Sequence, residues 1–76
     1  MNIADRILYL RKSKGISQEE LADKVGVSRQ AVSKWESEQS MPDVEKIIIM
    51  SDYFNVTTDY ILKGIEVVEK KKVKKL

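Results

Sequence analysis

A three-residue link, Gly26-Val27-Ser28, constrains the fold of this chain more than any other feature. It separates two short segments, each of which follows a serine that can cap a helix. Ser17 precedes the first segment, and Glu20 follows at the spacing of a capping box, in which two residues satisfy each other's backbone N–H groups. Gly26 can adopt the positive φ that ends a helix, and Ser28 can start the next one. The pattern therefore predicts two short helices joined by a tight turn.

Apolar residues at helical spacing predict further helices around this pair. Ile3, Ile7 and Leu10 mark the first helix, while Asp43 and Thr57 are placed to cap the last two. Only three glycines and one proline interrupt the 76 residues, which favours helices over a fold of many short strands. We expect an all-α, compact five-helix bundle with helices at residues 3–13, 18–25, 29–36, 44–54 and 58–64.

Each predicted helix has one apolar face, which we expect to lie in the core. In the helix at residues 29–36 this face consists of Ala31, Val32 and Trp35. We expect Trp35 to be a core residue and not a platform on which a base stacks. The fourth helix is expected to bury Val44, Ile47, Ile48, Met50, Ser51 and Phe54.

Basic residues are concentrated at the C-terminal end. The chain has 14 basic and 12 acidic residues, and five of its lysines fall within the last seven positions. Residues 1–64 hold nine basic and ten acidic groups, so the net charge of this part is −1. We expect residues 1–64 to form one domain and residues 65–76 a flexible lysine-rich extension, which could attract DNA, link to another domain or aid solubility. Overall charge therefore does not indicate nucleic-acid binding, and the positions of individual charges must decide.

The absence of cysteine and histidine excludes several classes of function. Disulfides, zinc sites built on these residues and catalysis by a histidine base all need side chains that the chain lacks. We expect no enzymatic activity, no cofactor, no metal and no small-molecule ligand. The longest apolar run, at residues 47–50, is far shorter than the ~20 residues of a membrane span. The chain also begins without signal-peptide features, so we expect a cytoplasmic protein.

Two short helices joined by a turn that contains glycine form the helix-turn-helix pattern. An α-helix fits the major groove of B-DNA, so a protruding second helix can lay its side chains against base edges. Arg29 can donate two hydrogen bonds to guanine O6 and N7, Gln30 can bond adenine N6 and N7, and Ser33 can bond several bases. We therefore predict that these three residues read bases.

The sequence resembles the Cro and lambda-repressor type of helix-turn-helix domain, also called the XRE family. Its most specific element is the series Gln18, Ala22 and Gly26, followed at once by Val27 and Ser28. The resemblance implies the five-helix fold, with the helix-turn-helix formed by the second and third helices, and DNA binding through the third. It extends over residues 3–64 and is carried by residues 15–22, 27–36, 43–54 and 55–64.

The resemblance also implies roles for individual residues. Gln18 matches the residue that bonds a phosphate and braces the first base-reading side chain, which here is Arg29. Arg11 and Glu36 match a structural ion pair that ties the first helix to the end of the third. The positions that match contacts with the DNA backbone are Gln18, Ser28, Lys34, Ser37, Gln39 and Ser40.

A few residues depart from the family pattern. Glu38 stands in the loop after the third helix, near a place where the family often has glycine, and its charge would repel a phosphate unless it turns away. Leu8, Tyr9 and Ile49 occupy positions that are usually polar. Ile49 and Tyr53 are four residues apart and would share one face of a helix, so we expect an apolar patch there that could mediate self-association.

These features support two hypotheses of function. The first is a sequence-specific transcriptional regulator, a repressor, that binds a palindromic duplex as a homodimer and inserts its third helix in the major groove. The alternative is an antitoxin or protein–protein adaptor that uses the same fold without reading DNA. The outward polar residues of the third helix favour the first hypothesis.

Overall fold

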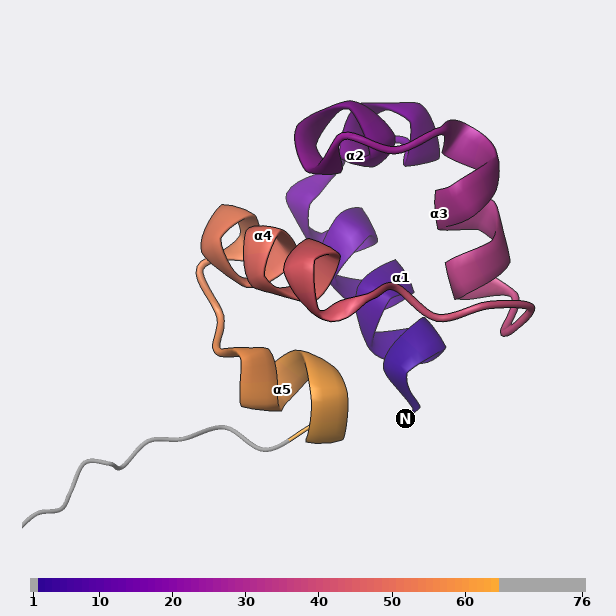
Figure 1. The fold of residues 1–76 in the computed structure, drawn as a ribbon. Coiled ribbons are helices and arrows are strands. Elements are labelled where there is room, and N and C mark those ends of the chain that lie inside the picture. Colours follow the sequence, from indigo (N-terminus) through magenta and orange to yellow (C-terminus); the bar gives the residue numbers. More distant parts are fainter. Residues whose placement is uncertain (1, 65–76) are drawn as a thin grey trace, which may run out of the picture.

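The computed structural model describes residues 2–64, and this part of the chain consists of five α-helices with no strand (Figure 1). The expected all-α fold is thereby confirmed. The extension predicted at residues 65–76 lies outside the described residues. No helix within residues 2–64 is both long enough and apolar enough to cross a membrane. The helices are α1 (Ile3–Lys14), α2 (Gln18–Val25), α3 (Arg29–Glu36), α4 (Val44–Phe54) and α5 (Thr58–Lys63).

Each helix begins where a side chain bonds the free N–H groups of its first turn. Asn2 Oδ1 accepts a hydrogen bond of 2.9 Å from the backbone N–H of Asp5. Ser17 and Glu20 form the complete capping box, with N···O distances of 3.0 Å and 2.9 Å. Because such bonds are local, the sequence predicted the starts of all five helices correctly. The remaining caps are Ser28, Asp43 and Thr57.

Gly26 closes the turn between α2 and α3. Its φ is 82°, in the left-handed region that favours glycine. The N–H groups of Gly26 and Val27 both donate to the carbonyl oxygen of Ala22, over 2.8 Å and 3.0 Å. Ser28 caps α3 immediately afterwards. The tight turn expected from the sequence is thus present, and it fixes where α3 starts relative to α2.

The core takes one fully buried large side chain from every helix. These five side chains meet at the centre of the bundle, where α1 packs on α3 and α5, and α4 packs on α2 and α5. Trp35 is only 5% exposed, which confirms it as a core residue. Val32 and Trp35 together attach α3 to the bundle and leave its opposite face free. The five are Ile7, Leu21, Val32, Met50 and Ile61.

The buried set predicted for α4 is wrong at two positions. Val44 is 72% exposed and Ile48 is 49% exposed, whereas Ile47 and Met50 are buried as expected. Val44 is the first helical residue, one turn before the buried stripe starts at Ile47. Ile48 is rotated about 100° from Ile47, because an α-helix has 3.6 residues per turn. Three successive isoleucines cannot all face one core.

The apolar patch expected at Ile49 and Tyr53 is not an open surface. Both side chains are half-buried and pack against the core. The ring of Tyr53 lies edge-on to Phe54, with ring centroids 5.1 Å apart, and the Nζ of Lys14 lies 5.1 Å from its centroid. The sequence pattern placed these residues on one face correctly, but that face borders α1 through Lys14. Self-association through Ile49 and Tyr53 stays a prediction.

Arg6 is a buried charged residue that the sequence pattern did not indicate. It is 5% exposed, and its Nε donates to the carbonyl oxygen of Ile61 over 2.8 Å. Its Nη2 donates to the carbonyl oxygen of Leu62 over 2.9 Å. The last carbonyls of a helix lack partners within the helix, and a cation beside them also suits the helix dipole. Arg6 therefore attaches the end of α5 to α1.

Candidate nucleic-acid interface

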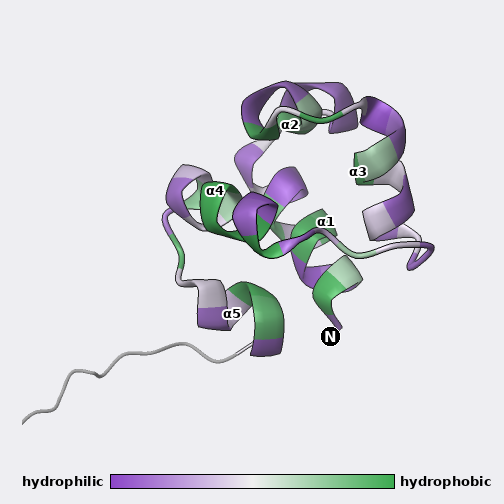
Figure 2. Cartoon of the chain, in the orientation of Figure 1, coloured by the Kyte–Doolittle hydropathy of each residue, from purple (hydrophilic) through white to green (hydrophobic). Residues whose placement is uncertain are grey.

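The outward face of α3 carries the three residues predicted to read bases. Arg29 and Gln30 are exposed and Ser33 is half-buried. Figure 2 shows hydrophilic residues at both ends of α3 and hydrophobic residues in its middle. Positions 29, 30 and 33 fall within about 100° of one another around the helix axis, so their side chains share one side. The buried side chains on the other side hold this face outward.

The side chain of Gln18, in the first turn of α2, reaches the first residue of α3. The Nη1 of Arg29 donates to the Oε1 of Gln18 over 3.5 Å, a long and exposed hydrogen bond. Ser28 Oγ accepts from the backbone N–H of Ala31 over 3.2 Å, which leaves its hydroxyl hydrogen available as a donor. Lys34 is exposed in the last turn of α3. Gln18, Ser28 and Lys34 therefore surround the face that carries Arg29.

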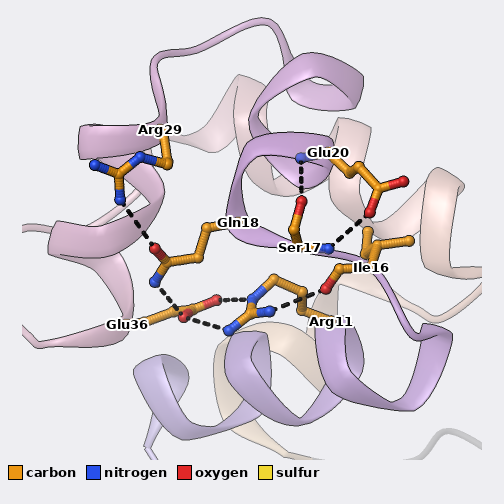
Figure 3. A network of polar contacts seen from close by, with 7 residues as sticks. All are labelled: Arg11, Ile16, Ser17, Gln18, Glu20, Arg29 and Glu36. Atoms are coloured by element: carbon orange, nitrogen blue, oxygen red, sulfur yellow. Dashed lines mark hydrogen bonds and ion pairs between the residues drawn. The ribbon is translucent and has the colours of Figure 1, made fainter.

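The ion pair expected between Arg11 and Glu36 is formed. Arg11 Nε donates to Glu36 Oε2 over 2.7 Å, and Nη2 donates to Oε1 over 3.1 Å. The side chains are 12% and 6% exposed, so the pair is largely shielded from water. Arg11 Nη1 also donates to the carbonyl oxygen of Ile16 over 2.9 Å. One guanidinium thus joins α1, the segment before α2 and the end of α3 (Figure 3).

Comparison with known proteins identifies this architecture. A family model described as helix-turn-helix matches residues 7–61, which is more than half of the chain. The chain belongs to the helix-turn-helix family. The resemblance drawn from the sequence is thereby confirmed, and the geometry of α2, the turn and α3 is the family's defining feature.

The relatives of this helix-turn-helix chain include regulators of transcription. It is 40% identical over 68 residues to the HTH-type transcriptional activator BcrR of Enterococcus faecalis, covering 90% of this chain and 33% of BcrR. It is 37% identical over 62 residues to the repressor protein C2 of Salmonella phage P22, covering 82% of this chain and 29% of that repressor. The chain thus spans about a third of the length of these two relatives.

A solved structure shares the fold in detail. The P22 c2 repressor in complex with a synthetic operator superposes with a TM-score of 0.81 and is 35% identical. The match covers 86% of this chain and 98% of that chain. The five-helix arrangement of this helix-turn-helix domain therefore matches that of the P22 c2 repressor.

The loop after α3 exposes the other residues predicted to contact the DNA backbone. Ser37, Gln39 and Ser40 are all exposed, and Gln39 Nε2 donates to Ser37 Oγ over 2.9 Å. The N–H groups of Gln39 and Ser40 donate to the carbonyl oxygen of Lys34 over 2.9 Å and 3.3 Å, which closes the end of α3. Side chains and backbone together hold this loop of the helix-turn-helix domain against α3.

Glu38 occupies a strained backbone position in the same loop. Its φ is 67°, in the left-handed region that costs most residues about 1–2 kcal/mol. Glycine takes this conformation freely, which gives a physical reason for its frequency at this place in the family. Glu38 is exposed, so its carboxylate stays in water. The only non-glycine residues with positive φ in the described part of the chain are Glu38 and Asn55.

One contact at the interface was not predicted. Gln18 Nε2 donates to Glu36 Oε1 over 2.9 Å, which joins the start of α2 to the end of α3 (Figure 3). The sequence pattern assigned Gln18 to DNA and Glu36 to Arg11, but it gave no sign that the two side chains meet. They are 18 residues apart, and only the angle between α2 and α3 brings them together.

Proposed function

We propose that this chain is the DNA-binding domain of a transcriptional regulator and inserts α3 in the major groove of double-stranded DNA. The observation that carries the proposal is the division of α3 into two faces. Val32 and Trp35 are buried, while Arg29 and Gln30 are exposed and Arg29 contacts Gln18. An α-helix presented in this way matches the width of the major groove. The P22 c2 repressor, which has the same fold, was solved with an operator.

Three residues of α3 are proposed to read bases. Arg29 donates to guanine O6 and N7, Gln30 bonds adenine N6 and N7, and Ser33 bonds a neighbouring base. The guanidinium of Arg29 has five N–H groups, and its contact with Gln18 uses one of them. The remaining donors are enough for a bidentate bond to guanine.

A second set of residues is proposed to hold the DNA backbone. Gln18 lies in the first turn of α2 and Ser28 caps α3, so both lie where free backbone N–H groups attract a phosphate. Lys34 adds a positive charge at the far end of α3. Such contacts fix the register of the helix in the groove without selecting a sequence. The loop residues proposed to join this set are Ser37, Gln39 and Ser40.

The proposed unit on DNA is a homodimer on a palindromic duplex. One copy of α3 reaches only a few base pairs, so two copies on half-sites about one helical turn apart gain affinity and specificity. The relatives include both an activator and a repressor. We propose repression here, because occupying a site is enough to exclude other proteins from it. The activity is one of binding without catalysis or cofactor, and we place it in the cytoplasm.

Selection of bound sequences from a random pool of duplexes tests the proposal. We expect a single enriched motif made of two inverted half-sites. Enrichment of single half-sites would support DNA reading but contradict the dimer. Failure to enrich any sequence would overturn the proposal and leave the protein–protein adaptor as the function to test, by measuring whether the Arg29→Ala and wild-type chains capture the same partner.

A further inference from the structure

The carboxylate of Glu36 accepts hydrogen bonds from two different helices. Its Oε2 accepts from Arg11 Nε over 2.7 Å, and its Oε1 accepts from Arg11 Nη2 over 3.1 Å. The same Oε1 accepts from Gln18 Nε2 over 2.9 Å. Since the side chain of Glu36 is only 6% exposed, little water competes for these bonds. Figure 3 shows Glu36 between Arg11 and Gln18, with Arg29 beyond Gln18.

This arrangement decides which way the amide of Gln18 points. A glutamine amide has a donating NH₂ group and an accepting oxygen, and rotation of the amide exchanges them. In the reverse orientation Gln18 Oε1 would face the carboxylate of Glu36, acceptor against acceptor. Its NH₂ group would then face the guanidinium of Arg29, donor against donor. Both contacts are favourable only in the observed orientation, in which Oε1 accepts from Arg29 Nη1.

We propose that Glu36 is a positioning residue for base recognition, although it lies at the end of α3 remote from Arg29. By holding Nε2 of Gln18, it directs Oε1 toward Arg29 and so orients the guanidinium before DNA arrives. A donor group that is already oriented loses less freedom on binding and discriminates better between bases. This inference rests on the proposed function, because it assigns Glu36 a part in the selectivity of Arg29.

Two variants that both lack the ion pair separate this role from plain stabilisation of the fold. Arg11→Met removes the pair but leaves the Glu36 carboxylate facing Gln18. Arg11→Met/Glu36→Met removes that carboxylate as well, with side chains of similar length. The measurement is the selectivity ratio, which is the Kd for a duplex changed at the base pair that Arg29 reads divided by the Kd for the preferred duplex. That base pair is the one whose preference Arg29→Ala abolishes. Circular dichroism confirms that each variant is folded at the temperature used.

We expect Arg11→Met to keep this ratio within about twofold of wild type, and the double variant to lower it about three- to tenfold, a part of what one bidentate base contact contributes. The base pair read by Gln30 serves as an internal control. Its ratio should be unchanged in both variants, because Gln30 has no link to Glu36. Equal ratios for the two variants at the Arg29 position would overturn the proposal, and so would a parallel loss at the Gln30 position.

Glu36→Gln provides an independent test in a chain that keeps a partner for Arg11. A glutamine at position 36 can place its oxygen where Oε1 lies, where it still accepts from Arg11 Nη2 and Gln18 Nε2, so the amide of Gln18 keeps its orientation. We therefore expect Glu36→Gln to keep the selectivity at the Arg29 position within about twofold of wild type, in contrast to the double variant. A loss of selectivity in Glu36→Gln as large as in the double variant would contradict the proposal.

A measurement without DNA distinguishes failure of this inference from failure of the proposed function. The side-chain amide protons of Gln18, followed by ¹H–¹⁵N NMR, should keep a hydrogen-bonded shift in Arg11→Met and move to an exposed shift in the double variant. An exposed shift in the wild-type chain would overturn the role of Glu36 alone. A wild-type chain with bonded Gln18 protons that selects no duplex would instead overturn the proposed function, and the positioning role with it.

Discussion

Arg6 donates a hydrogen bond of 2.8 Å from its Nε to the carbonyl oxygen of Ile61, 55 residues farther along the chain. The bond closes the bundle between its first and last described helices. Ile61 is itself fully buried, so the contact lies where apolar packing and a charged hydrogen bond meet. The last carbonyl oxygens of a helix need hydrogen-bond donors from outside the helix, and a buried guanidinium supplies them where water cannot.

Arg6→Met should lower the free energy of unfolding by about 2–4 kcal/mol, because it leaves buried carbonyl oxygens without a charged donor. Urea unfolding followed by circular dichroism measures this change. Lys12→Met is the matched control, since it removes a charge from an exposed position of the same helix. Its effect should stay within about 0.5 kcal/mol. Equal effects of the two substitutions would show that the Arg6 bonds contribute nothing.

Glu38→Gly should raise stability by up to about 1 kcal/mol, because glycine relieves the left-handed strain but adds freedom to the unfolded chain. Glu38→Gln keeps the strain and removes only the charge, so its stability should equal that of wild type. Both variants should bind duplexes more tightly at low salt, since an anion leaves the loop beside α3. Unfolding and DNA titration on the same samples separate the two effects, and a Glu38→Gly chain no more stable than Glu38→Gln would contradict the strain.

Arg29→Ala should cost about 1–3 kcal/mol on the selected duplex and remove the preference at one base pair. Affinity for unrelated duplexes should fall less, because they offer no matching guanine. Gln30→Ala is the control, since it should relax a different position of the same half-site. The measurement is fluorescence anisotropy with duplexes changed one pair at a time. A uniform loss for all duplexes would show that Arg29 binds the backbone and reads no base.

Lys34→Ala should weaken binding to every duplex alike and reduce the slope of log K against log salt by about one unit. The physical reason is that one phosphate contact releases about one counterion. Lys63→Ala removes the same charge from α5, which lies across the bundle from α3 (Figure 1), and should leave the slope unchanged. A slope that changes equally in both variants would reveal an effect of net charge alone.

The boundaries of the helices followed from the sequence because their causes are local. A capping side chain and the N–H group that it bonds lie three residues apart, as Ser28 and Ala31 do. Gly26 and Asn55 likewise end helices through their own left-handed conformation. Such signals need no knowledge of the tertiary fold, so the chain order of the five helices could be predicted in full.

The contacts that were missed depend on the angles between helices. Arg6 sits on an amphipathic helix among charged residues and is expected to be solvated until α5 is placed beside it. Gln18 and Glu36 meet only once α2 and α3 have packed. The exposure of Ile48 is a related case, because three neighbouring isoleucines compete for one core and periodicity alone does not rank them. Residue spacing predicts a face, but packing decides what covers it.

The shared carboxylate of Glu36 has a consequence for protein engineering. Grafting residues 29–36 onto another scaffold is the simplest way to transfer a DNA preference, and it treats the helix as a self-sufficient cassette. Under the proposed role of Glu36, the orientation of Arg29 depends on Gln18, which belongs to another helix. A transplant would carry its specificity intact only into a host that has a glutamine in the place of Gln18.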